Sequence, residues 1–194
     1  MPKTSTATEI LRSDLQESIL TKQKVMDQLL PQIARAAEWM VEALKNGNKV
    51  IFFGNGGSAA DAQHLAAELV GRFAKERKGL PSMALTTDSS ILTAIGNDFT
   101  FDYVFARQME ALGKSGDVAV GITTSGNSPN VVAAIELARK MGLKTIGLTG
   151  GTGGKLKDAA ELAIVIPSNS TPRIQESHIA LGHAICHVID EELA

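Results

Sequence analysis

Short apolar runs alternate with longer segments of helical character along most of this chain, and no other feature constrains the fold as strongly. Five such runs follow residue 48, with the sequences KVIFF, SMALT, DVAVGIT, KTIGLT and LAIVI. Continuous apolar runs of this length are typical of strands buried on both faces of a parallel sheet and joined by crossover helices. The sequence therefore predicts an α/β fold, a three-layer αβα sandwich with about five parallel strands.

The two ends of the chain are predicted to be helical. Apolar residues recur at helical spacing in residues 1–47, although Pro31 should break or kink that stretch. A second long helix is expected from about Pro172 to Leu193. A chain of 194 residues with 44% hydrophobic content can bury one sizeable core. We therefore expect a helical extension, 1–47, and one sandwich domain, 48–194.

Composition excludes several functional classes. The net charge of −2 lacks the basic excess of a nucleic-acid-binding protein, and no apolar run approaches the roughly 20 residues that cross a bilayer. The single Cys186 cannot form an internal disulfide, and the opening MPKTSTATE lacks the apolar core of a secretory signal. We expect a cytoplasmic protein that binds a small molecule or another protein, with no nucleic-acid or membrane partner.

The first glycine-rich turn, GNGGSA at residues 54–59, lies between a predicted strand and a predicted helix. It fits the looser dinucleotide pattern, but the acidic residue expected about 20 positions later is missing, since SMALTTD reaches its acid only at Asp88. GTGGKL is not a phosphate P-loop, because Leu156 replaces the required Ser or Thr. The first turn is therefore either an anion-binding helix start, with Ser58 as a capping or ligand hydroxyl, or an ordinary tight turn.

A second turn, TTSGNSPN at residues 123–130, follows another predicted strand and is rich in hydroxyl groups. Hydroxyls and amides bind a phosphate ester by hydrogen bonds and suit a sugar phosphate that must leave again. The same residues also fit simple turn chemistry, with Ser128 as a helix cap and Pro129 at the first helical position. Both interpretations are compatible.

Candidate metal ligands lie on two predicted helices. His64 and Glu68 are four residues apart on a helix expected at 58–73, so they face one side of it and could bind zinc or form an exposed pair. The last helix carries further candidates, and helical spacing does not choose among them: Gln175, Glu176, His178, His183 and His187.

Four motifs together resemble those of the phosphoheptose isomerases in the sugar isomerase (SIS) family: GNGGSAADAQHLAAELVGRF, AIGNDF, TTSGNSPN and RIQESHIALGH. The resemblance implies a flavodoxin-like SIS sandwich that assembles as a homotetramer. It implies interconversion of sedoheptulose 7-phosphate and D-glycero-D-manno-heptose 7-phosphate, the first step of bacterial ADP- or GDP-heptose synthesis for lipopolysaccharide and other surface glycans.

The resemblance also assigns residues. One zinc ion per subunit is implied, with ligands His64, Glu68, Gln175 and His183. The implied substrate contacts lie in the motifs or beside them: Asn55, Gly56, Gly57, Ser58, Asp61, Glu68, Arg72, Asn97, Asp98, Thr123, Thr124, Ser125, Ser128 and Gln175. Thr123 stands where some relatives have serine, which keeps the hydroxyl group.

Aldose–ketose isomerisation moves a proton between adjacent carbons through an enediol, so it needs a base, an acid and a group that polarises the carbonyl. We expect Glu68 to be the base and His183 the opposing acid or base, with zinc as a Lewis acid on the sugar oxygens. The metal and base roles of Glu68 compete, because a carboxylate held by zinc is a weaker base. The alternative is a non-catalytic SIS protein that associates with a replication initiator or senses a sugar phosphate, and such a protein has no need of the pair of Glu68 and His183.

Overall fold

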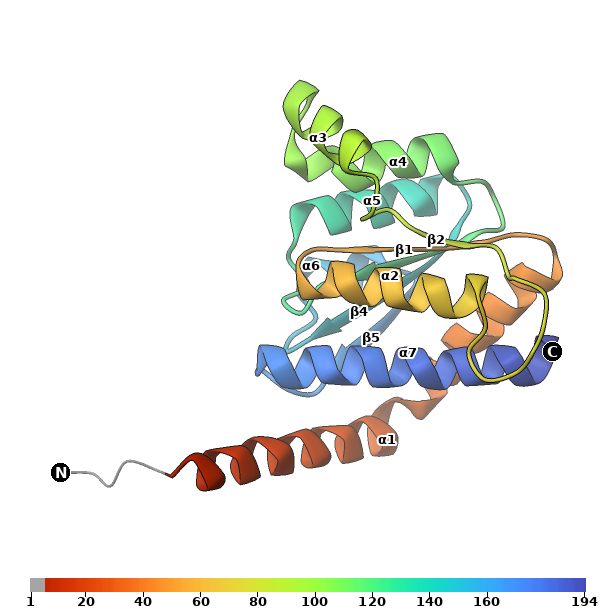
Figure 1. Ribbon diagram of the computed structural model, residues 1–194. Coiled ribbons are helices and arrows are strands. Elements are labelled where there is room, and N and C mark those ends of the chain that lie inside the picture. Colours follow the sequence, from red (N-terminus) through yellow and green to blue (C-terminus); the bar gives the residue numbers. More distant parts are fainter. Residues whose placement is uncertain (1–5) are drawn as a thin grey trace.

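The computed structural model describes residues 6–194 and contains a parallel sheet of five strands in the order β2-β1-β3-β4-β5 (Figure 1). The strands are β1 Val50–Gly54, β2 Ser82–Ala84, β3 Val118–Ile122, β4 Lys144–Gly150 and β5 Leu162–Ile166. All five apolar runs thus form the predicted strands, and every pairing is parallel. β1 and β3 are buried along their whole length, as expected of central strands between two helical layers.

Helices cover both faces of the sheet. The helices are α1 Ala7–Lys45, α2 Gly57–Val70, α3 Ser89–Asp98, α4 Val104–Leu112, α5 Pro129–Lys140, α6 Gly154–Ala159 and α7 Thr171–Leu193, with a 3₁₀ turn at Phe101–Tyr103. One apolar core joins α1, α2 and α7 to the sheet, and a second core joins α3, α4, α5 and α6 to the opposite face. The predicted three-layer sandwich is therefore confirmed (Figure 1).

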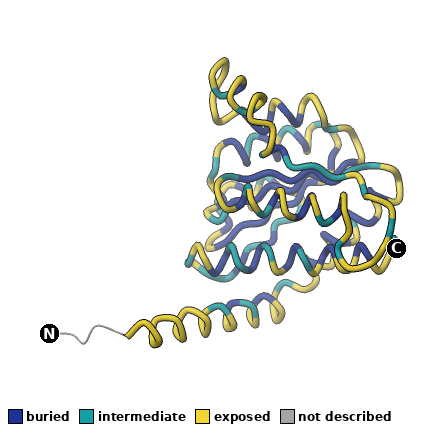
Figure 2. Tube along the Cα trace, in the orientation of Figure 1, coloured by how far each residue is buried: buried dark blue, intermediate teal, exposed yellow. Residues whose placement is uncertain are grey.

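Helix α1 is continuous through Pro31, so the proline does not break it, but the helix changes direction partway along its length (Figure 1). The helix begins with a capping box, in which Thr6 and Glu9 each accept a hydrogen bond from the other's backbone N–H. Its second half is held by burial of residues such as Ala36 and Met40 in the core, which favours the helical path despite the proline. The turns before Thr21 are mostly exposed and extend beyond the sandwich (Figure 2).

Helices α2 and α7 run side by side over the same face of the sheet (Figure 1). Gly182 of α7 lies directly against α2, where an added Cβ would come 2.6 Å from Leu65. This close approach brings the polar side chains of the two helices within reach of one another. Within residues 6–194, no helix has the length and apolarity that crossing a bilayer requires.

Candidate active site

The first glycine turn leads from β1 into α2 at the carboxyl end of the sheet. Gly56 occupies the position before the helix with φ of 56°, a conformation that favours glycine, and no side chain caps the helix. Ser58 is buried inside the first turn, so its hydroxyl is not the cap that the sequence suggested as one option. The N–H groups of Ser58 and Ala59 donate to the backbone carbonyls of Asn55 and Gly56. No side chain covers the helix start, whose partial positive charge favours an anion.

A pair of amides joins the first turn to the second. Asn55 and Asn130 exchange two hydrogen bonds, with N–O distances of 2.9 and 3.0 Å. Asn130 is buried on α5, so Asn55 is fixed against the start of that helix. The two turns are therefore one connected surface, as expected where the carboxyl ends of neighbouring parallel strands meet.

The hydroxyl groups of the second turn bond to one another. Thr123 Oγ1 lies 2.8 Å from Ser128 Oγ and 3.4 Å from Ser125 Oγ. Ser128 stands at the N-cap position of α5, with Pro129 at the first helical position as predicted, but its side chain makes no capping bond. The hydroxyl is instead engaged with Thr123, and the helix N-terminus remains available to an anion. Thr124 is half-buried beside this group.

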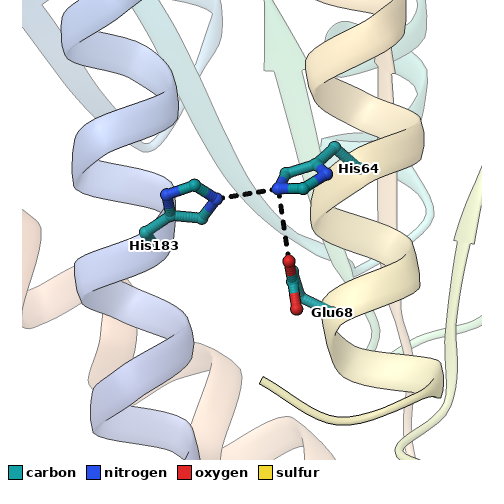
Figure 3. Close-up of side chains that lie close together, drawn as sticks. All are labelled: His64, Glu68 and His183. Atoms are coloured by element: carbon teal, nitrogen blue, oxygen red, sulfur yellow. Dashed lines mark hydrogen bonds and ion pairs between the residues drawn. The ribbon is translucent and has the colours of Figure 1, made fainter. Parts of the chain in front are cut away.

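His64, Glu68 and His183 form a compact group between α2 and α7 (Figure 3). His64 Nε2 lies 2.8 Å from His183 Nε2 and 3.2 Å from Glu68 Oε1, so His64 stands between the other two. One ligand atom from each residue lies within 4.8 Å of the others. The side chain of His64 is 49% exposed, so the group opens to the surface.

Asp61 lies one turn before His64 on α2. Its Oδ2 is buried without a hydrogen-bond partner among the described residues. Burial raises the pKa of Asp61 above its usual value, against a smaller lowering effect of His64 and His183. A buried acceptor without a donor is costly, so this carboxyl group is available to a ligand, a water molecule or a neighbouring side chain.

The other polar candidates on α7 have separate partners. His178 is buried, and its Nε2 lies 3.1 Å from the carbonyl oxygen of Thr149, while the exposed His187 pairs with Glu191. Glu176 accepts a hydrogen bond from Ser18 of α1. Packing of α7 on α2 therefore selects His183 from candidates that helical spacing left open. Cys186 is a buried free thiol, as expected of a core cysteine.

The side chain of Gln175, a residue of α7, lies against the start of α2 and not beside His64 and His183. A Cβ added to Gly57 would stand only 1.6 Å from Gln175 Nε2, so the glutamine side chain packs on the glycine backbone. Gln175 precedes His183 by eight residues, or about 12 Å along the helix axis. Within one chain, Gln175 is therefore close to the first turn and apart from the three clustered residues.

The remaining predicted contacts are exposed. Asn97 and Asp98 end α3, where the Asn97 amide donates to the Asp98 carboxylate at 2.8 Å. Figure 1 places α3 at the outer edge of the sandwich, away from α7. Arg72 follows the end of α2 and is exposed. None of these three side chains is drawn into the His64 group within the single chain.

The clustered residues fit a divalent metal ion. Two imidazole nitrogens and one carboxylate oxygen form a donor set found in catalytic zinc sites, which keep a fourth position for water or substrate. The 2.8 Å separation of the two ring nitrogens is that of a hydrogen bond in which one imidazole donates and the other accepts. The described structure therefore supports a metal-ligand group of His64, Glu68 and His183.

One pair of buried charges at this helix pair was not predicted. Arg77 follows α2, Asp190 lies near the end of α7, and their side chains meet at 2.7 Å. They are 113 residues apart in the chain, so no local pattern connects them.

Comparison with known proteins agrees with this geometry. The family model described as SIS domain matches residues 15–150. A phosphoheptose isomerase from Aliarcobacter butzleri is 57% identical over 171 residues, which is 88% of this chain and 90% of the relative.

Two solved structures named phosphoheptose isomerase extend the comparison. That from Neisseria gonorrhoeae has a TM-score of 0.89 and 47% identity, covering 96% of this chain and 100% of the other. That from Francisella tularensis has a TM-score of 0.93 and 40% identity, with the same coverage. The chain therefore belongs to the phosphoheptose isomerase family of SIS domain proteins.

Proposed function

We propose that this protein is an aldose–ketose isomerase that converts sedoheptulose 7-phosphate into D-glycero-D-manno-heptose 7-phosphate through an enediol. The observation that carries the proposal is the meeting of Glu68, His64 and His183 between α2 and α7. A carboxylate and two imidazoles within hydrogen-bonding range supply the proton acceptor and donor that this reaction needs. The three relatives compared above, which are 40–57% identical to this chain, are all named phosphoheptose isomerase.

Glu68 and His183 divide the proton transfers in this proposal. Glu68 removes a proton from the carbon beside the ketose carbonyl and, after this proton exchanges with solvent, delivers a proton to the former carbonyl carbon. His183 serves the sugar oxygens, donating to the one that becomes a hydroxyl and accepting from the one that becomes the carbonyl. His64 lies within 3.2 Å of both partners and holds them in line.

Zinc, one ion per subunit, is the metal that we propose for His64, Glu68 and His183, because its preferred ligands are of these types. When bound, it supplies Lewis-acid polarisation of the sugar oxygens. Gln175, the fourth ligand implied by the resemblance, packs on Gly57 and is better placed to contact the substrate. A carboxylate bound to zinc is less basic, so the metal also limits the reactivity of Glu68.

The phosphate group of the substrate is assigned to the two turns. Hydroxyl groups of Thr123, Ser125 and Ser128 can donate hydrogen bonds to the phosphate. No side chain caps the N-termini of α2 and α5, whose partial positive charge attracts an anion without a formal positive charge. The proposed substrate contacts remain those of the sequence: Asn55, Gly56, Gly57, Ser58, Asp61, Glu68, Arg72, Asn97, Asp98, Thr123, Thr124, Ser125, Ser128 and Gln175.

We further propose that the protein is a homotetramer built through α1. Five large apolar side chains in the first half of this helix are 51–67% exposed: Ile10, Leu11, Leu15, Ile19 and Leu20. An apolar stripe of this size is typical of a subunit interface, and the exposed His64 group would also gain from coverage by a neighbour. Sedimentation should give four times the mass of the 20.5 kDa chain, and a monomer at micromolar concentration would contradict this assignment.

A phosphorylated sugar does not cross membranes unaided, so we place the activity in the cytoplasm, at the start of bacterial heptose synthesis. The direct test is conversion of sedoheptulose 7-phosphate followed by NMR, with protein stripped by a chelator and then restored with zinc. A new aldose signal that depends on zinc supports the enzyme and its metal. A folded tetramer that produces no aldose under either condition would overturn the proposal in favour of a binding protein.

A further inference from the structure

The buried pair of Arg77 and Asp190 connects the segment that follows α2 to the last turns of α7. Arg77 Nε donates to Asp190 Oδ1 at 2.7 Å, and the two side chains are only 2% and 0% exposed. A buried ion pair is weak evidence for net stability, because removing both charges from water costs about as much as their attraction returns. Its position in the molecule is more informative.

The remaining donors of Arg77 hold the end of α2. Its guanidinium nitrogens donate to the carbonyl oxygens of Glu68 and Leu69, both at 2.9 Å. The last carbonyls of a helix have no partner within it and carry partial negative charge, so a buried guanidinium is well suited to cap them. Arg77 therefore fixes the backbone of Glu68 itself.

Asp190 holds the other side of the same connection. Its Oδ2 accepts the backbone N–H groups of Ala74 and Lys75 at 2.8 and 2.9 Å. Burial alone would raise the pKa of Asp190, but these bonds and the charge of Arg77 outweigh it, and the pKa lies below its usual value. The carboxylate is thus charged and fully engaged at neutral pH.

The pair is close to the reacting groups without touching them. Asp190 follows His183 by seven residues, which is about two turns on nearly the same side of α7. Arg77 donates a hydrogen bond to the backbone of Glu68, and Asp190 lies on the same helix as His183. The ion pair of Arg77 and Asp190 therefore joins the end of α2 to α7.

We propose that Arg77 and Asp190 act as positioning residues that set Glu68 against His183. The proposal rests on the function assigned above to those two residues. Both side chains are buried, so their effect passes through the placement of α2 relative to α7. Misplacement of reacting groups by about 1 Å can lower a rate about 100-fold, so such a connection would govern turnover.

The chain offers a matched control just before β3, on neither of the two helices that carry Glu68 and His183. Asp117 is also 0% exposed, accepts the backbone N–H groups of Lys49 and Lys114, and pairs with the Lys49 ammonium group. Asp190→Asn and Asp117→Asn therefore remove the same charge from similar surroundings, in one case on the helix of His183 and in the other outside α2 and α7.

The test compares these variants in thermal unfolding, in kcat and KM for sedoheptulose 7-phosphate, and in the affinity of chelator-stripped protein for zinc alone. Both should lose stability. Asp190→Asn should lower kcat by about 10- to 100-fold, change KM less, and weaken zinc binding about tenfold or more, whereas Asp117→Asn should change none of the three. Arg77→Lys keeps a positive charge but loses the forked contacts, and it should resemble Asp190→Asn.

Wild-type kcat and zinc affinity in folded Asp190→Asn protein would overturn the proposal, and if that variant does not fold, Arg77→Lys decides by the same measurements. If the wild type binds zinc but forms no heptose phosphate, the proposed function is wrong. The positioning role is then tested by the zinc affinities of the variants relative to the wild type. If the wild type neither binds zinc nor reacts, both proposals are overturned.

Discussion

Polar side chains at the amino ends of the strands differ in their hydrogen bonding from those near the carboxyl ends. At the amino ends, Asp117 accepts four hydrogen-bond donors, and Thr145 and Glu161 satisfy each other through three further bonds. Near the carboxyl ends, the buried Oδ2 of Asp61, Oγ1 of Thr149 and Nδ1 of His178 have no partner among the described residues. The polar groups at the amino ends of the strands thus have hydrogen-bond partners within the protein, whereas these three near the carboxyl ends do not among the described residues.

This difference separates stability from function. A buried polar group without a partner costs about 1–3 kcal/mol, so such groups are kept mainly where a ligand or ordered water completes them. Substitutions in the networks of Asp117 and Thr145 should therefore affect stability alone, and those in the two turns at the carboxyl ends should affect substrate binding. The following variants test that division.

Among the variants that test this division, the largest effect is expected from Gly57→Ala. The new Cβ would lie 1.6 Å from the present position of Gln175 Nε2, so the flexible end of that side chain must move. Helix propensity favours alanine over glycine by about 1 kcal/mol. We expect kcat/KM to fall about 100-fold with thermal stability unchanged or raised. Steady-state kinetics and thermal unfolding measure the two effects.

Gly96→Ala is the control for this change. Gly96 lies in α3 and has no heavy atom within 4 Å of an added Cβ, so it tests helix propensity without displacing a neighbour. It should leave kcat/KM unchanged. Wild-type kcat/KM in Gly57→Ala would refute a role for the position of Gln175.

A smaller effect is expected from removing one hydroxyl at each end of the strands. Ser128→Ala deletes a partner of Thr123 in the second turn, and a lost hydrogen bond to a charged phosphate should raise KM about tenfold with little change in kcat. Thr145→Val deletes the hydroxyl that serves Glu161 and should cost about 1–2 kcal/mol of stability without changing KM. Equal KM values in Ser128→Ala and Thr145→Val would contradict the proposal that the carboxyl ends of the strands bind substrate and the amino ends do not.

The smallest effect concerns His178. Burial lowers its pKa to about 4, against the weaker raising effect of the Thr149 carbonyl. Because the unfolded chain binds this proton near pH 6.5, the stabilising contribution is complete above that pH and is lost as the pH falls toward 4.

Between pH 7 and 5.5 the loss should be about 1 kcal/mol more in the wild type than in His178→Gln, which has no titrating group at that position. Urea unfolding at the two pH values measures the difference. Parallel losses in both proteins would show that His178 does not contribute.

The sequence predicts the fold well because the five apolar runs are local signals. His64 and Glu68 were also accessible, since their spacing lies within one helix. The choice of His183 came from resemblance, because its selection depends on how α7 packs on α2. Arg77 and Asp190 left no local signal for the same reason: their contact is created by the tertiary fold. Ser128 illustrates a further limit, since its hydroxyl bonds to Thr123 in place of the predicted cap.

The central claim is that Glu68 moves a proton between adjacent carbons, and conversion of sedoheptulose 7-phosphate in deuterated water tests it most directly. NMR should detect aldose product from the wild type with deuterium at the carbon next to the aldehyde. Glu68→Gln, folded as the wild type, should lower the rate by about 1,000-fold. Labelled product formed by Glu68→Gln at the wild-type rate would contradict the account.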